Sequence, residues 1–124
     1  MLDRVSIKIP ASPAYLQVVR LIAAGLASRL GFTIDDIEDL KIAVDELSAY
    51  LTGAQGREGT LDIGFVIDGD RIEITGAGNF TAGIKVRTEL TEFSRQILGT
   101  VADSATLQQT DGVPTFTVSK AKRN

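Results

Sequence analysis

The stretch that decides the fold lies between residues 36 and 51 and reads DIEDLKIAVDELSAYL. Its apolar residues recur every three or four positions, which predicts a helix with one buried face: Ile37, Leu40, Val44, Leu47 and Leu51. Thr33 can cap this helix, the acidic residues 35–39 favour its positive end, and Gly53 can end it. A second stripe beside the apolar one contains Asp39, Ala43, Glu46 and Tyr50.

The segments on either side show alternating strand and helix signals. A strand is predicted at 5–9, and a helix follows from Ser12 and Pro13 to Gly31, with Val18 or Val19 on its buried face. Strands at 61–67 and 72–74 form a hairpin, after which Gly76 to Gly83 is predicted to be a glycine-rich loop. The remaining predicted elements are a helix at 89–101 that buries Leu90, Phe93, Ile97 and Val101, and strands at 105–109 and 115–120.

This order of elements predicts an α+β fold. Hairpins dominate, so the sheet should be mostly antiparallel, and three apolar helix stripes require the helices to cover one face of it. We expect a two-layer α/β sandwich formed by one domain over residues 1–124.

Composition excludes several kinds of chemistry. The 124 residues are 44% apolar and 23% charged, and they include no Cys and no His. Disulfides, thiolate metal sites and histidine-based catalysis are therefore excluded, and no metal site is predicted. The net charge is −3, and the only basic cluster, Lys120, Lys122 and Arg123, is interpreted as a solvated tail. We expect neither nucleic-acid nor membrane binding, and a cytoplasmic location.

Spacing alone leaves the candidate site residues with two interpretations each. Glu46 fits either a solvated acid at the edge of the helix or an acid that faces a cavity between helix and sheet. Gly76 and Gly78 fit either a wide turn or a backbone that approaches a ligand closely. They form neither a Rossmann nor a Walker A pattern.

The segment 36–51 resembles the signature helix of the histidine-kinase-like (Bergerat) ATPases, in the branch of the anti-sigma-factor serine/threonine kinases. That helix reads Leu-x-x-Ala-Val-x-Glu-Ala-x-x-Asn, in which the Glu orients or deprotonates the attacking group and the Asn binds magnesium. Residues 43–46 match, and Glu46 falls at the family's acid. Tyr50 stands in place of the magnesium-binding Asn, and a phenol does not replace that amide oxygen.

The other family motifs are altered as well. Gly76 and Gly78 match the glycines of Asp-x-Gly-x-Gly, but Ile74 stands where the family's Asp reads adenine. Glu92 and Ser94 fall at the Gly-x-Gly that cradles phosphate. Thr115 matches a Thr that supports the adenine pocket.

The resemblance thus implies a nucleotide pocket whose fold survives and whose polar contacts have been lost. The former pocket would contain Ala43, Tyr50, Ile74, Gly76, Gly78 and Thr115. We expect a regulatory module without cofactor that binds a sigma factor or an anti-sigma antagonist in bacterial partner switching, with a homodimer as an option.

Two alternatives remain open. One is an active ATP- and magnesium-dependent serine/threonine kinase with Glu46 as its base. The other is a sensor that binds a small ligand in the former nucleotide cleft, which Tyr50, Ala43 and Ile74 would make more apolar.

Overall fold

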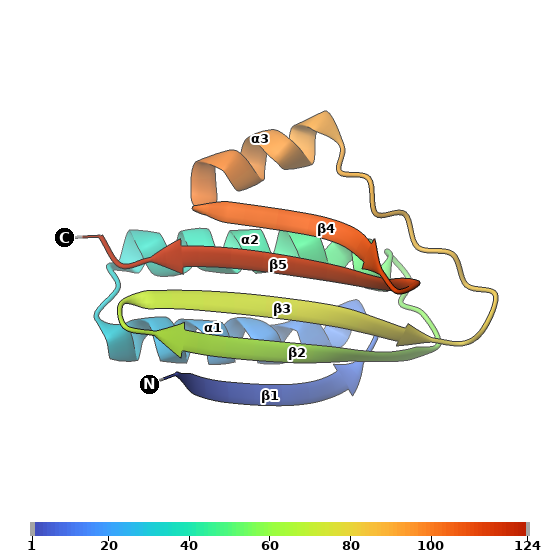
Figure 1. The fold of residues 1–124 in the computed structure, drawn as a ribbon, viewed down its shortest axis with the longest axis horizontal. Helices are drawn as coiled ribbons and strands as arrows, with labels where there is room; N and C mark the ends of the chain where they lie inside the picture. Colours follow the sequence, from blue (N-terminus) through green and yellow to red (C-terminus); the bar gives the residue numbers. More distant parts are fainter. Residues whose placement is uncertain (1, 124) are drawn as a thin grey trace.

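A computed structural model describes residues 2–123 and shows one five-stranded sheet with three α-helices on one face (Figure 1). All neighbouring strands are antiparallel, and their order is β1-β2-β3-β5-β4. The expected fold class is confirmed. The elements are β1 (Asp3–Pro10), a 3-10 turn (Pro13–Tyr15), α1 (Leu16–Leu30), α2 (Ile34–Thr52), β2 (Gly59–Asp68), β3 (Arg71–Phe80), α3 (Glu92–Val101), β4 (Ser104–Thr110) and β5 (Val113–Ala121).

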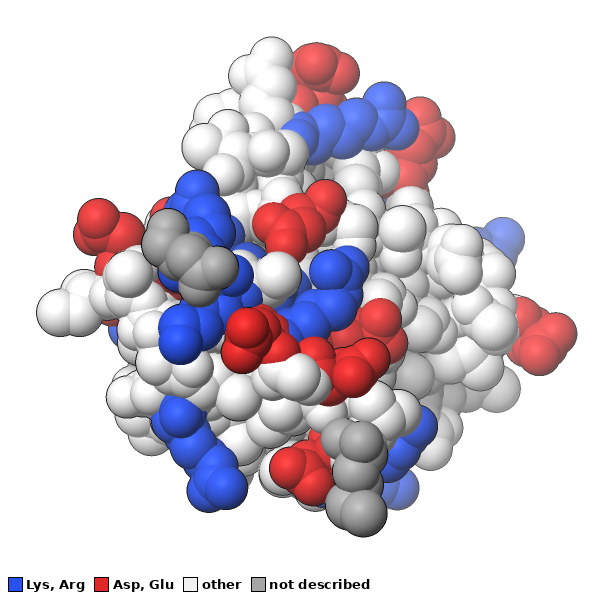
Figure 2. Space-filling view, turned by 60° about the vertical axis from the view of Figure 1, so that its left-hand side comes forward, with Lys and Arg blue, Asp and Glu red and all other residues white. Residues whose placement is uncertain are grey.

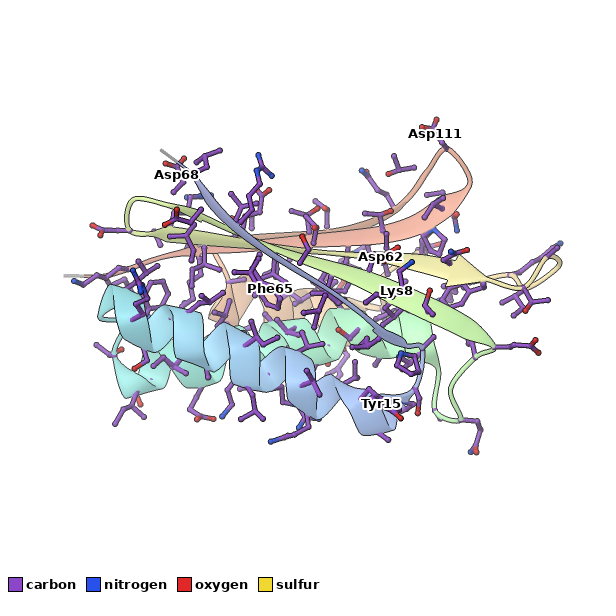
Figure 3. The ribbon with its side chains drawn as sticks, turned by 90° about the horizontal axis from the view of Figure 1, so that it is seen from below. Lys8, Tyr15, Asp62, Phe65, Asp68 and Asp111 are labelled. Carbon is purple, nitrogen blue, oxygen red and sulfur yellow. The ribbon has the colours of Figure 1, made fainter. Side chains whose placement is uncertain are left out.

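The core lies between the sheet and the helices. Successive strand residues point to opposite faces, so alternate residues of each strand face the helices. Phe65 of β2 is one of these, and Figure 3 shows its side chain between the sheet and the helix layer. Lys8 and Asp62 lie on the opposite face, where their charged groups form an exposed ion pair at 3.6 Å.

Helix α2 is the central helix of the core layer (Figure 1), and it has the buried apolar face that its sequence predicts. The Thr33 hydroxyl caps it by accepting a hydrogen bond from the Asp36 amide, and the helix ends at Gly53. Leu40, Val44 and Leu47 are fully buried. The helix therefore holds Glu46 and Tyr50 at fixed positions at the edge of the core.

The other two helices differ from the sequence expectation in detail. In α1, Val19 is buried and Val18 is exposed. Helix α3 begins at Glu92 rather than at residue 89, and its buried face is formed by Ser94, Leu98 and Val101. Phe93 was expected in the core, but it is 70% exposed because it lies to one side of that face.

The predicted glycine-rich loop is wrong in its first half, because residues 76–80 continue strand β3. Gly76 pairs with Phe116 of β5, and Gly78 pairs with Leu61 of β2. The irregular segment comprises only residues 81–91. The glycines are tolerated inside the strand because aromatic rings lie against their backbone, as described below.

The basic tail is not a solvated end, so that expectation is also wrong. Lys120 is 3% exposed; its ammonium group donates to the Val101 carbonyl at 3.0 Å and lies 3.7 Å from the Asp36 carboxylate. Arg123 also donates to Asp36, which is 2% exposed. Figure 2 shows acidic and basic side chains intermixed at this end of the molecule. The cluster joins the start of α2, the end of α3 and the end of β5.

Candidate functional site

The structure divides the predicted pocket residues among several places. Glu46 and Tyr50 line a shallow hollow of about 350 Å³ between α2 and α3. Ala43, Ile74 and Gly76 are buried in the core. The candidate residues therefore do not line one continuous cleft.

Thr115 lies on the other side of the sheet. It pairs with Ala77 of β3, whereas its neighbour Phe116 pairs with Gly76 and faces the helices. Because side chains alternate along a strand, Thr115 points to the open face. Its hydroxyl donates to the Val113 carbonyl at 3.2 Å. The structure does not bring Thr115 together with the other predicted site residues.

Glu46 takes part in a network of side-chain hydrogen bonds that we call the polar clasp, formed by Glu46, Tyr50, Thr91 and Ser94. The Ser94 hydroxyl donates to Glu46 Oε2 at 2.5 Å, and it lies 2.7 Å from the Tyr50 hydroxyl. The Thr91 amide donates to the Tyr50 hydroxyl at 3.0 Å. The Thr91 hydroxyl caps α3 by accepting from the Ser94 amide at 3.0 Å. The clasp thus attaches the first turn of α3 to α2.

The clasp also affects the ionisation of Tyr50. Burial raises the pKa of this phenol, whereas the hydrogen bond that its oxygen accepts from the Thr91 amide lowers the pKa. The Tyr50 oxygen is therefore already engaged by groups of its own chain.

Two aromatic rings lie against the glycines of the expected adenine motif. A Cβ atom on Gly76 would lie 2.3 Å from the ring of Phe116, and a Cβ on Gly78 would lie 2.3 Å from the ring of Phe80. Phe116 is fully buried. At these two positions, the close approach that glycine permits is used by side chains of the same chain.

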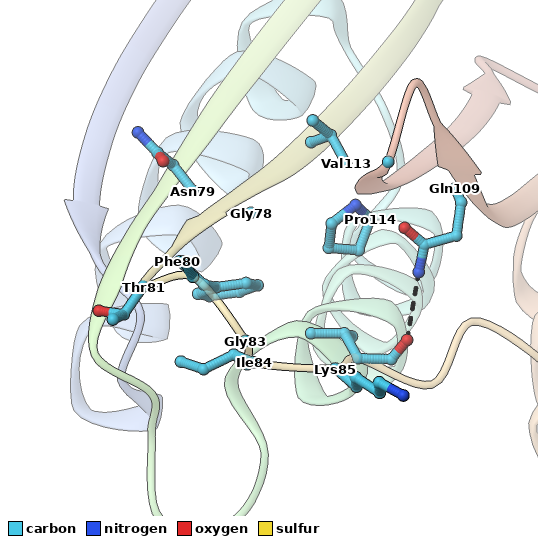
Figure 4. Close-up of a pocket in the computed structure, with 13 residues that line it drawn as sticks. Gly78, Asn79, Phe80, Thr81, Gly83, Ile84, Lys85, Gln109, Val113 and Pro114 are labelled. Atoms are coloured by element: carbon cyan, nitrogen blue, oxygen red, sulfur yellow. Dashed lines mark hydrogen bonds between the residues drawn. The ribbon is translucent and has the colours of Figure 1, made fainter.

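A larger cavity, of about 550 Å³, lies beyond the end of β3 (Figure 4). Its wall contains Gly78 and Phe80, part of the segment 81–91, and the β4–β5 turn. The side-chain amide of Gln109 donates to the Val86 carbonyl across it at 3.2 Å. Of the predicted pocket residues, Gly78 is the one in its wall.

Sequence reasoning missed Thr91 and Arg57. Arg57 donates to the carbonyls of Leu51 and Tyr50 at the end of α2, and its guanidinium lies 6.0 Å from the centre of the Phe80 ring. Thr91 could have been recognised as a helix cap, since it comes three residues before Ser94. No local signal points to Arg57, because its role depends on where the chain turns after α2.

Among residues 2–123, no group of three or more acidic side chains is placed to hold a metal ion. Within the same range, none of the helices has the length and apolar character needed to cross a bilayer.

The five-stranded antiparallel sheet with three helices on one face, and the position of Glu46 on α2, resemble the histidine-kinase-like ATPases. Solved structures agree on the fold: the RsbU and RsbW domains of a Mycobacterium tuberculosis protein match 98% of this chain and 33% of that one, with a TM-score of 0.64 and 16% identity. No family model matches the chain.

Curated proteins similar to this chain are serine-protein kinases. The chain is 40% identical over 77 residues to serine-protein kinase RsbW of Bacillus pumilus, which covers 58% of this chain and 48% of that protein. Against serine-protein kinase RsbW of Bacillus velezensis it is 44% identical over 77 residues, covering 58% and 47%. The resemblance to the anti-sigma-factor kinase branch is thereby confirmed. The chain spans about half the length of the curated relatives it matches.

Proposed function

We propose that this chain is a regulatory protein-binding module related to the anti-sigma-factor kinases, with a degenerate ATP site. It would act by partner switching in bacterial transcription, and its partner would be a sigma factor or an anti-sigma antagonist. Relatives named serine-protein kinase RsbW support the kinase ancestry. The resemblance also supports a homodimer, which sedimentation or light scattering would test.

The observation that carries this proposal is that the altered motif positions bind one another. Ser94, at a position of the expected phosphate cradle, donates to Glu46, and Tyr50, at the expected magnesium ligand, contacts Ser94. Each polar group thereby has a partner within the chain, so a nucleotide would have to displace an existing hydrogen bond for each new one.

The residues present also fit magnesium-ATP poorly. The phenol of Tyr50 has one oxygen, which already accepts from the Thr91 amide, and Ile74 offers adenine no acceptor. Glu92, in the first turn of α3, would repel a phosphate group. These features favour a protein that has kept the kinase scaffold without its nucleotide contacts.

Calorimetric titration tests the proposal directly. Magnesium-ATP and magnesium-ADP should give no measurable heat of binding at micromolar concentrations, with an RsbW relative from Bacillus as the positive control. Each lost contact should cost about 1–3 kcal/mol, so losing three of them weakens a micromolar site by a factor of at least about 100, which takes it out of the micromolar range. Micromolar binding of either nucleotide would contradict the degenerate site.

An active serine/threonine kinase is the second candidate, because Glu46 is hydrogen-bonded to a serine hydroxyl and the relatives carry that activity in their name. It would transfer phosphate from ATP to a partner serine, and Glu46→Gln would abolish the transfer. Incubation with radiolabelled ATP and a candidate antagonist protein measures the transfer of phosphate. Under our proposal, neither the wild type nor Glu46→Gln should transfer phosphate.

A small-ligand sensor is favoured by one observation, the cavity of about 550 Å³ beside Phe80. Ala43 and Ile74, which were expected to make the former cleft apolar, are instead closed off by neighbouring residues. Native mass spectrometry of the purified protein would reveal a retained ligand.

A further inference from the structure

The hydrogen bonds of the polar clasp run in one direction. Ser94 has a single hydroxyl proton, and this proton is donated to Glu46, so the Tyr50 hydroxyl must be the donor toward Ser94. The Tyr50 oxygen in turn accepts from the Thr91 amide. The chain of donors therefore starts at a backbone amide and ends on the Glu46 carboxylate, and each bond polarises the next.

Ser94 takes the place at Glu46 that a hydroxyl group from another molecule would need. Its oxygen lies 2.5 Å from Glu46 Oε2, within the range from which a carboxylate takes a proton. Ser94 is 3% exposed, so a second hydroxyl cannot approach that carboxylate oxygen along the same path while α3 stays in place.

The position of α3 depends on the clasp at one end of the helix only. Its apolar contacts come from Leu98 and Val101 in the second half, whereas its first turn is held through Thr91 and Ser94. The preceding segment, residues 81–91, contains no helix or strand. The attachment of the first turn of α3 to α2 therefore depends on the clasp, whereas Val86 and Leu90 of the preceding segment pack against the core.

We propose that the clasp is a masking contact, in which Ser94 acts as an internal pseudosubstrate that occupies the Glu46 carboxylate and withholds it from hydroxyl groups of other proteins. The inference rests on the proposed function in one respect, that Glu46 is the carboxylate of the ancestral kinase site. A ligand or partner that draws the first turn of α3 away from α2 would expose Glu46.

The test compares Ser94→Ala with Thr100→Ala. Both remove one hydroxyl from α3, but the Thr100 hydroxyl donates to the Gln96 carbonyl within the helix and lies outside the clasp. Each folded protein is treated with a water-soluble carbodiimide and a small amine, and labelling of Glu46 is measured by mass spectrometry relative to the exposed Glu73.

Labelling of Glu46 relative to Glu73 should rise about fivefold in Ser94→Ala, the factor expected from loss of one hydrogen bond of ordinary strength. It should stay unchanged in Thr100→Ala. Amide hydrogen exchange at residues 92–95 should accelerate in Ser94→Ala and not in Thr100→Ala. Unchanged labelling and exchange in Ser94→Ala would overturn the proposal.

Tyr50→Phe provides a second variant should Ser94→Ala fold poorly. It removes the donor to Ser94 while leaving Glu46 and Ser94 in place, so labelling of Glu46 should rise by a smaller factor. Unchanged labelling of Glu46 in Tyr50→Phe would likewise contradict the proposed role of the clasp.

Titration of Ser94→Ala with magnesium-ATP separates the two proposals. More labelling without nucleotide binding supports both the clasp and the degenerate site. More labelling with new micromolar binding supports the clasp and overturns the degenerate site. Unchanged labelling overturns the clasp, whether or not nucleotide binds.

Discussion

The surroundings of Gly76 depend on a residue that is distant in the sequence. Its backbone lies against the ring of Phe116, with which it pairs across β3 and β5. From the sequence, the glycines at 76 and 78 predicted a loop or a ligand contact, because local spacing contains no information about which ring lies over them. The alternating residues of β2 needed no such partner and were predicted correctly.

The Gly76→Ala variant should lower the free energy of unfolding by about 1–3 kcal/mol, the usual cost of overpacking a core. The new Cβ would lie 2.3 Å from the Phe116 ring, which must move. Urea denaturation followed by circular dichroism measures the change.

Gly25→Ala is the matched control for this substitution. Gly25 is an exposed residue of α1 with nothing within 4 Å of its would-be Cβ. Alanine there should raise the free energy of unfolding by about 0.5–1 kcal/mol, because glycine is a poor residue inside a helix. Equal effects of the two substitutions would contradict the packing described for Phe116.

At the scale of elements, Asp36 connects α2 to the end of the chain. The sequence predicted the helix and its cap from local signals, and both are confirmed. It did not predict that the carboxylate is buried against Lys120 and Arg123, because Arg123 lies 87 positions away. Charge patterning identifies a residue as acidic but does not identify its partner.

The Asp36→Asn variant should lower the free energy of unfolding by about 3 kcal/mol at pH 7, because it leaves the buried ammonium group of Lys120 without its counter-ion. Urea denaturation measures the free energy of unfolding. Asp62→Asn, at the exposed ion pair with Lys8, should change this free energy by less than about 1 kcal/mol.

The free energies of unfolding of the wild type and of Asp36→Asn should depend differently on pH. The hydrogen bond from Arg123 lowers the pKa of Asp36 below the ordinary value of 3.8, although burial opposes it. The stabilisation is therefore fully present above pH 3.8 and is lost as the pH falls through the lower, folded-state pKa. The difference between wild type and Asp36→Asn should shrink in acid, and a constant difference from pH 7 to pH 2 would contradict this assignment.

At the scale of the whole molecule, the sheet and the helices share one hydrophobic core. Unfolding should therefore be one cooperative transition. Far-ultraviolet circular dichroism and tyrosine fluorescence of the Tyr15→Phe variant should give the same urea midpoint, since its remaining tyrosine, Tyr50, reports on the contact between α2 and α3. A fluorescence transition at lower urea would show instead that α3 separates before the core unfolds.

The order of strands has a consequence for how the protein is made. The last strand, β5, does not lie at an edge of the sheet but between β3 and β4. A nascent chain emerging from the ribosome can pair β1, β2 and β3 early, but β4 has no neighbour until β5 has left the exit tunnel. Until then β3 has a free edge, and an aggregation-prone intermediate with such an edge would be the species that chaperones meet during synthesis.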